Sequence, residues 1–130
     1  MIFSSMNEDG IPTWKLVMEG KKTVTRRTRP IEIGKILAVQ PKRGAKAICH
    51  IKILKCQDDA KWQTYAYRTL TIMDKYFGEI DEEILAREAM KEGFHSWKGL
   101  WKWIETHYGK IPDKLYRIEF VKITNEEANP

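Results

Sequence analysis

The sequence predicts a single α+β fold or a small barrel flanked by helices. The chain has 130 residues, of which 42% are hydrophobic, which suits one domain with one modest core. Its strand-like segments are short and end at Gly and Pro turns, and its helical segments do not alternate with them regularly. Regular alternation would indicate a parallel βαβ sheet, so this order favours an α+β arrangement.

The N-terminal third begins with a strand candidate at residues 2–6, followed by a turn rich in Asn, Asp and Gly. Pro12 suits the first turn of a helix, and Gly20 suits the position just beyond its end. Apolar residues at helical spacing lie between them. A short helix is therefore expected to end where a basic segment begins.

Two strands are expected next, at residues 36–39 and 45–55, joined by a turn at 41–44. In the second strand Ala47, Cys49, Ile51 and Ile53 fall on one face, which predicts a buried side. Residues 62–73 are rich in aromatic and β-branched side chains, and this composition predicts a further extended segment.

The C-terminal half predicts two helices and a strand. The first helix starts at Asp81, with acidic residues in its first turn, and stops at Gly93. Ser96 caps the second helix, whose apolar residues recur at i, i+3, i+4 and i+7: Trp97, Leu100, Trp101, Ile104 and Tyr108. A strand at residues 115–123 closes a domain of residues 1–123, and residues 124–130 form a polar tail.

Positive charge is concentrated in one part of the chain. The formal net charge is +5, but residues 21–55 carry eleven Lys or Arg against one acid, Glu32, a net charge of +10. The flanking parts are slightly acidic. This distribution predicts a basic surface for a polyanion such as RNA, with a solvated lysine-rich surface as the alternative.

Other features limit the class of protein. Two cysteines are too few for a disulfide scaffold and are expected to be reduced. Cys49, His50 and Cys56 are an alternative zinc site, but neighbours on a strand point to opposite faces, so we predict neither a metal nor a cofactor. There is no long apolar run or signal-peptide pattern, which predicts no membrane association and a cytoplasmic monomer or weak dimer.

One motif stands out at the start of the basic part: Gly20-Lys21-Lys22-Thr23-Val24-Thr25-Arg26-Arg27. The turn Glu92-Gly93-Phe94 before the amphipathic helix, and the closing strand at residues 116–120, complete a pattern. Together these features resemble the ASCH superfamily of small PUA-like domains. The resemblance implies a mixed β-barrel flanked by helices, with a cleft between the basic motif and the Glu-Gly-Phe turn.

The resemblance also implies a function. ASCH domains are associated with RNA binding, and some are hydrolases that remove the acetyl group of N4-acetylcytidine with a lysine, a threonine and a glutamate. Those positions correspond here to Lys22, Thr25 and Glu92. A lysine can act as base for a threonine hydroxyl if its pKa is lowered. Lys22 and Thr25 are three residues apart, however, so only a loop or bulge would bring them together.

We therefore expect a domain that binds RNA or a modified nucleoside through a basic cleft at residues 21–29, with the amidohydrolase as the alternative. A protein-interaction domain also remains open, as does the question whether the chain is an enzyme. In another interpretation Lys22, Thr25 and Glu92 are ordinary surface, strand and helix-end residues, and Trp103 covers the edge of the core. The candidate nucleic-acid contacts are Lys21, Arg26, Arg27, Arg29, Lys42, Arg43 and Lys46, with Trp103 as a stacking platform.

Overall fold

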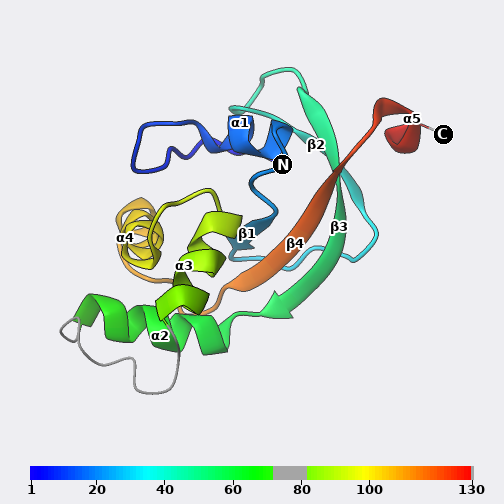
Figure 1. Ribbon diagram of the computed structural model, residues 1–130. Helices are drawn as coiled ribbons and strands as arrows, with labels where there is room; N and C mark the ends of the chain where they lie inside the picture. Colours follow the sequence, from blue (N-terminus) through cyan, green and yellow to red (C-terminus); the bar gives the residue numbers. More distant parts are fainter. Residues whose placement is uncertain (72–81, 130) are drawn as a thin grey trace.

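The computed structural model describes residues 1–71 and 82–129 and shows a mixed α+β domain (Figure 1). Its strands form one antiparallel sheet in the order β1-β4-β3-β2. They are β1 (Val24–Arg27), β2 (Ile36–Val39), β3 (Cys49–Asp58) and β4 (Tyr116–Ile123). The last strand of the chain therefore lies between the first and the third.

The described sheet is open, so the predicted closure into a barrel is wrong. Only β3 and β4 are long, and the edge strands β1 and β2 have four residues each. β1 pairs with the beginning of β4, whereas β2 pairs with the beginning of β3, which lies beside the end of β4. The two edge strands thus occupy opposite corners of the sheet and are too short to meet.

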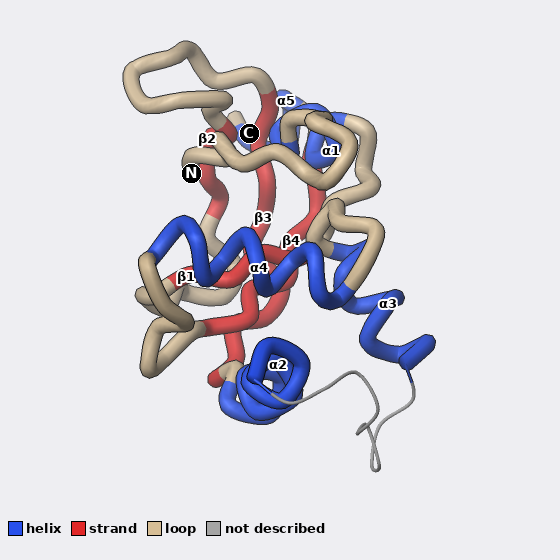
Figure 2. The backbone as a smooth tube through the Cα atoms, turned by 90° about the vertical axis from the view of Figure 1, so that its left-hand side faces the viewer, coloured by secondary structure: helices blue, strands red, loops and turns tan. Residues whose placement is uncertain are grey.

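The helices are α1 (Thr13–Met18), α2 (Ala60–Thr71), α3 (Glu82–Lys91), α4 (Trp97–Tyr108) and the one-turn α5 (Asn125–Ala128). Helices α2, α3 and α4 lie together on one side of the sheet (Figure 1). In the view of Figure 2, α4 crosses in front of the strands. None of the described helices is both long and apolar enough to cross a bilayer.

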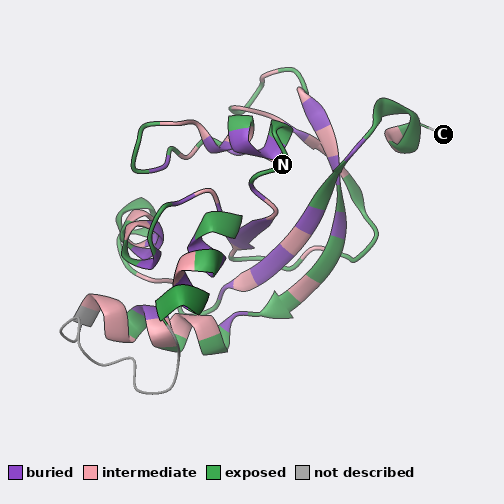
Figure 3. Cartoon of the chain, viewed as in Figure 1, coloured by how far each residue is buried: buried purple, intermediate pink, exposed green. Residues whose placement is uncertain are grey.

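Two hydrophobic clusters form the core. One lies among the helices and includes Trp97, Trp101 and Leu115, and the other lies on the sheet and includes Phe3, Ile51 and Ile118. In the first half of β3, the buried residues Cys49, Ile51 and Ile53 alternate with less buried ones (Figure 3), as expected for a strand with one covered face. The site described below lies between these two clusters.

Several predicted elements are confirmed. Helix α4 begins after Ser96, whose hydroxyl accepts a hydrogen bond from the Gly99 N–H at 2.9 Å, and ends at Gly109 in the left-handed conformation. Its predicted stripe is buried except for Tyr108 at the end. β2 has the predicted bounds, and β3 starts four residues later than expected. Cys49, Ile51 and Ile53 of the predicted face are buried, whereas Ala47 precedes the strand and is exposed.

Two local predictions are wrong. Residues 60–71 form helix α2 and are not extended, because Trp62, Tyr65 and Ala66 lie at helical spacing and pack on the helical cluster. The expected strand at residues 2–6 forms only isolated bridges, Ile2 to Gln40 and Met6 to Pro12. In the polar tail, Thr124 and Glu127 form a capping box that starts α5. The predicted helix start at Asp81, and residues 72–73 of the extended segment, lie outside the described residues.

Candidate functional site

A small cavity opens where four segments converge: residues 2–5, residues 22–27 with β1, the turn after α3, and α4. Its volume is about 70 Å³. That is room for about five water molecules or a small planar group. Lys22, Thr25 and Glu92, the residues identified from the motif, all contribute to its lining.

Lys22 reaches the cavity from irregular backbone, which removes the objection raised by its spacing from Thr25. Gly20 adopts a φ of 75°, and the N–H groups of Lys21 and Lys22 then both donate to the Leu16 carbonyl. The chain enters β1 only at Val24. Lys22 and Thr25 are therefore not related by the alternation of a regular strand.

The Lys22 ammonium is buried and fully hydrogen-bonded. The residue is 4% exposed, and its Nζ donates to the Val24 carbonyl at 2.9 Å, to the Glu92 carbonyl at 2.8 Å and to Glu92 Oε1 at 3.0 Å. Burial lowers the pKa of Lys22, while the charge of Glu92 opposes that shift. A lysine with a lowered pKa is suited to proton transfer.

Glu92 is presented by the tight turn at the end of α3. Gly93 follows with a φ of 90°, and a Cβ there would lie 2.7 Å from Leu16 Cδ1, so only glycine fits against α1. The Thr23 N–H donates to the Lys91 carbonyl at 2.8 Å and fixes this turn to the motif. Burial opposes ionisation of Glu92, but Lys22 and Arg26 hold its pKa below the usual value.

Thr25 lies in β1 opposite Ile118 and is 4% exposed. Its Oγ1 accepts a hydrogen bond from Arg27 Nε at 3.2 Å. The Lys22 ammonium donates to other acceptors, so within the described chain the hydroxyl and the ammonium share the cavity without a direct hydrogen bond.

Behind the cavity lies a buried ion network of three cations and three carboxylates: Lys22, Arg26, Arg117, Asp59, Glu88 and Glu92. Arg26 is its centre, with Nε 2.8 Å from Asp59 Oδ2, Nη1 2.8 Å from Glu92 Oε2 and Nη2 2.7 Å from Glu88 Oε2. Burial lowers the pKa of Arg26, but the three carboxylates outweigh burial, so that the pKa is raised above its usual value. Because the network holds equal numbers of cations and carboxylates, it is neutral as a whole when every group is ionised.

The sequence did not reveal the network, although it identified Lys22, Arg26 and Glu92 individually. Asp59 is the residue between β3 and α2, and Glu88 on α3 and Arg117 on β4 are both buried. In the sequence, Asp59 lies 33 residues from Arg26, Glu88 lies 62 residues away and Glu92 lies 66 residues away. No local spacing could indicate such pairings. The one local signal for the network was Arg117, which lies between Tyr116 and Ile118 in a strand.

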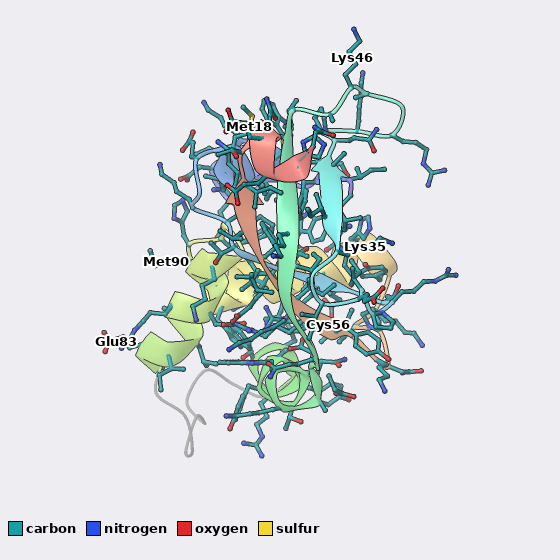
Figure 4. All side chains as sticks on the ribbon, turned by 90° about the vertical axis from the view of Figure 1, so that its right-hand side faces the viewer. Met18, Lys35, Lys46, Cys56, Glu83 and Met90 are labelled. Carbon is teal, nitrogen blue, oxygen red and sulfur yellow. The ribbon has the colours of Figure 1, made fainter. Side chains whose placement is uncertain are left out.

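The predicted nucleic-acid residues are divided by the fold. The side chain of Arg26 is 1% exposed and all three of its nitrogens bond to carboxylates, so it is not available to phosphate. Lys21 is exposed and pairs with Glu19 at 3.0 Å. Arg29, Lys42, Arg43 and Lys46 are exposed and do not line the cavity. Figure 4 shows Lys46 projecting from the loop between β2 and β3 at one end of the molecule.

Of the predicted contacts, Arg27 and Trp103 also line the cavity. Trp103 is partly buried against the helical cluster, and its ring stacks on His107 with centroids 4.7 Å apart and an interplanar angle of 11°. Trp103 therefore covers the edge of the core and also forms part of the cavity wall. His107 and Tyr108, which the sequence analysis did not select, complete this aromatic wall on α4.

The alternative zinc site receives no support. Across residues 1–71 and 82–129, no group of three or more His, Cys, Asp or Glu side chains is placed to hold a metal ion. Cys49 and Cys56 are free thiols on β3, and Cys49 is buried in the cluster on the sheet.

No family model matches this chain, and no curated protein matches it. Among solved structures, the chain is similar to the high-resolution crystal structure of an ASCH domain from Lactobacillus crispatus JV V101. The two share 15% sequence identity with a TM-score of 0.49, and the match covers 85% of this chain and 69% of that one.

Proposed function

We propose that this protein is an amidohydrolase that removes an acyl group from the exocyclic amine of a nucleobase, with N4-acetylcytidine as the expected substrate. The observation that carries the proposal is that Lys22, Thr25 and Glu92 line one cavity, with Lys22 Nζ 3.0 Å from Glu92 Oε1. The trio supplies a nucleophile, a base and an acid. The substrate class comes from the resemblance of the motif to ASCH domains.

The Lys22–Glu92 hydrogen bond supplies the required protonation states. Lys22 becomes a base only after it loses a proton, and Glu92 becomes an acid only after it gains one. Proton transfer along the 3.0 Å hydrogen bond achieves both at once and leaves the total charge of the site unchanged. Burial of both groups reduces the cost of forming the neutral pair, but Lys22 and Arg26 keep the pKa of Glu92 below its usual value. The ion pair is therefore the resting form, and the neutral pair forms in the course of the reaction.

The reaction then proceeds in two stages. The Thr25 oxygen adds to the acyl carbon as its proton passes to Lys22, and the carbon–nitrogen bond breaks as Glu92 protonates the leaving amine. This leaves an acyl ester on Thr25. Water hydrolyses the ester with the same two groups exchanging protons, so that amide and water yield a carboxylic acid and the free amine.

The aromatic wall supports a planar substrate. The stacked rings of Trp103 and His107 lie on α4 at the cavity, and aromatic side chains commonly bind single bases by stacking. The cavity itself accepts the acylated end of the base, and the rest of the nucleoside lies toward its opening.

The decisive test is hydrolysis of N4-acetylcytidine by the purified protein, followed as release of acetate and cytidine. Thr25→Ala is expected to lower turnover by about 1,000-fold or more, because it removes the nucleophile. Thr25→Ser keeps a hydroxyl and should retain measurable turnover. Thr28→Ala, an exposed threonine three residues away, is the matched control. Absence of turnover in the wild type, or full turnover by Thr25→Ala, would contradict the proposal.

A second candidate function, RNA binding, is favoured by a separate observation. Arg29, Lys42, Arg43 and Lys46 are exposed, and no carboxylate of the described residues lies within ion-pair distance of them. Unpaired cations on one segment are suited to phosphate contacts. They would let the protein hold an RNA that carries the modified base.

A further inference from the structure

Arg27 differs from the other cations at the cavity because none of the described carboxylates pairs with it. Lys22 and Arg26 each meet a carboxylate within 3.0 Å. Arg27 is partly buried, and in the described parts of the chain no carboxylate lies within 4.0 Å of it. Burial lowers the pKa of its guanidinium, although Tyr108 and Glu92 act in the opposite direction. A desolvated cation without a counter-charge is costly unless an anion joins it.

The guanidinium of Arg27 is held firmly in place. Its Nη2 donates to the Ile2 carbonyl at 2.8 Å, and its central carbon lies 5.0 Å from the centroid of the Phe3 ring. The N-terminal segment that provides these contacts is itself fixed, since the Phe3 N–H donates to the Gln40 carbonyl at 3.0 Å. The charge is thus oriented before any ligand arrives, which is the condition for electrostatic catalysis.

The remaining donors of Arg27 point to its role. Nε donates to Thr25 Oγ1 at 3.2 Å, so the guanidinium touches the proposed nucleophile. Nη1 bonds to none of the described residues, and it is not among the buried side-chain nitrogens and oxygens that lack a partner. Its surface is therefore accessible, and Arg27 is one of the residues that line the cavity.

We propose that Arg27 is a catalytic residue that binds the oxyanion formed when Thr25 adds to the acyl carbon. This inference rests on the proposed function. As the Thr25 oxygen bonds to the carbon, the carbonyl electron pair moves to the carbonyl oxygen, and the negative charge develops two bonds from Thr25 Oγ1, which Arg27 already contacts. Nη1 donates to the carbonyl oxygen. When the bond to the amine breaks, the electron pair on that oxygen re-forms the carbonyl double bond. Arg27 donates a hydrogen bond throughout and neither gains nor loses a proton.

Contact with the nucleophile favours this role over binding of a substrate phosphate. A phosphate of a nucleotide would lie at the far end of the sugar from the acylated amine. A cation for that group has no reason to hydrogen-bond to Thr25, whereas an oxyanion site requires proximity to it.

The test measures kcat and KM for N4-acetylcytidine with the intact protein and three variants: Arg27→Gln, Arg27→Lys and Thr25→Ala. Arg27→Gln is expected to lower kcat by about 100-fold or more with KM changed only a few-fold, as when one oxyanion donor is removed. Arg27→Lys keeps the charge and should retain an intermediate kcat. Arg87→Gln, an exposed arginine on α3, is the matched control. Thermal melting of each variant checks that it is folded.

The outcomes separate the two proposals. If Thr25→Ala abolishes turnover while folded Arg27→Gln or Arg27→Lys keeps the wild-type kcat, the role of Arg27 is overturned and the proposed function stands. A raised KM with unchanged kcat overturns it as well, because Arg27 would then bind the ground state. If the wild type shows no turnover, or if turnover survives Thr25→Ala, both proposals fail.

Discussion

Two groups of cations from the same basic segment have opposite environments. Lys22 and Arg26 are buried beside the cavity and bonded to carboxylates, whereas Lys42, Arg43 and Lys46 are exposed on the loop between β2 and β3. In the sequence each of these residues contributes one charge to the +10 of residues 21–55, whichever group it belongs to. Only the second group contributes to the charged surface, so segment charge overstates the area available to a polyanion.

The carboxylates make the difference. Asp59, Glu88 and Glu92 come from the start of α2 and the end of α3, and the fold packs these ends against β1. No described carboxylate lies within ion-pair distance of the exposed loop cations. The comparison teaches that a buried cation here serves the geometry of the site, while an exposed one is free for a partner.

Removing Arg26, the central cation of the buried network, should have the largest effect on stability. Arg26→Met should destabilise the protein by about 3–5 kcal/mol, because it leaves three buried carboxylates around an apolar side chain. Lys46→Met, which removes an exposed cation, should stay within about 0.5 kcal/mol of the wild type. Urea unfolding of both variants measures the difference. Equal stabilities for the two would show that the network contributes nothing to folding.

The carboxylates of the buried network should also make the stability of the protein depend on pH. Burial raises the pKa of Asp59 to about 6, although Arg26 opposes the shift. Asp59 Oδ1 has no hydrogen-bond partner among the described residues. A carboxyl with a raised pKa binds more protons in the folded state, so its contribution to stability is present below its unfolded pKa and is lost as pH rises toward about 6. Glu88 and Glu92 act in the opposite sense below their usual pKa range.

Asp59→Asn isolates this effect, because an amide does not titrate and the two glutamates are common to both proteins. Between about pH 4 and about pH 7, the wild type should lose on the order of 2 kcal/mol of stability relative to the variant. Urea unfolding at several pH values provides the curves. Parallel curves for the two proteins would mean that Asp59 ionises normally inside the network.

The smallest expected effect on stability comes from the exposed cations. Changing Lys42, Arg43 and Lys46 together to Gln should leave the free energy of unfolding within about 0.5 kcal/mol. If these residues contact RNA, the affinity for a single-stranded oligonucleotide falls and the slope of log K against log salt decreases by about 2. Titration at several salt concentrations measures both quantities. An unchanged slope would remove this loop as an RNA contact.

How far the sequence could predict the site depends on the distance between partners. The motif led to Lys22, Thr25 and Glu92, and the structure places all three around one cavity. It also led to Arg26 as a phosphate contact, because the type of residue was visible and its burial was not. The open sheet was missed for a similar reason, since strand lengths and the position of β4 between β1 and β3 are not local properties.

The sequence by itself determined the elements whose signals are local. The stripe and caps of α4 and the buried face of β3 follow from the spacing of a few neighbouring residues. Only the tertiary structure decided which charges are buried, that residues 60–71 form a helix, and that Arg27 lies beside Thr25 without a carboxylate. The physical reason is that burial and charge pairing depend on segments far apart in the chain, which meet only when the helices pack against the sheet.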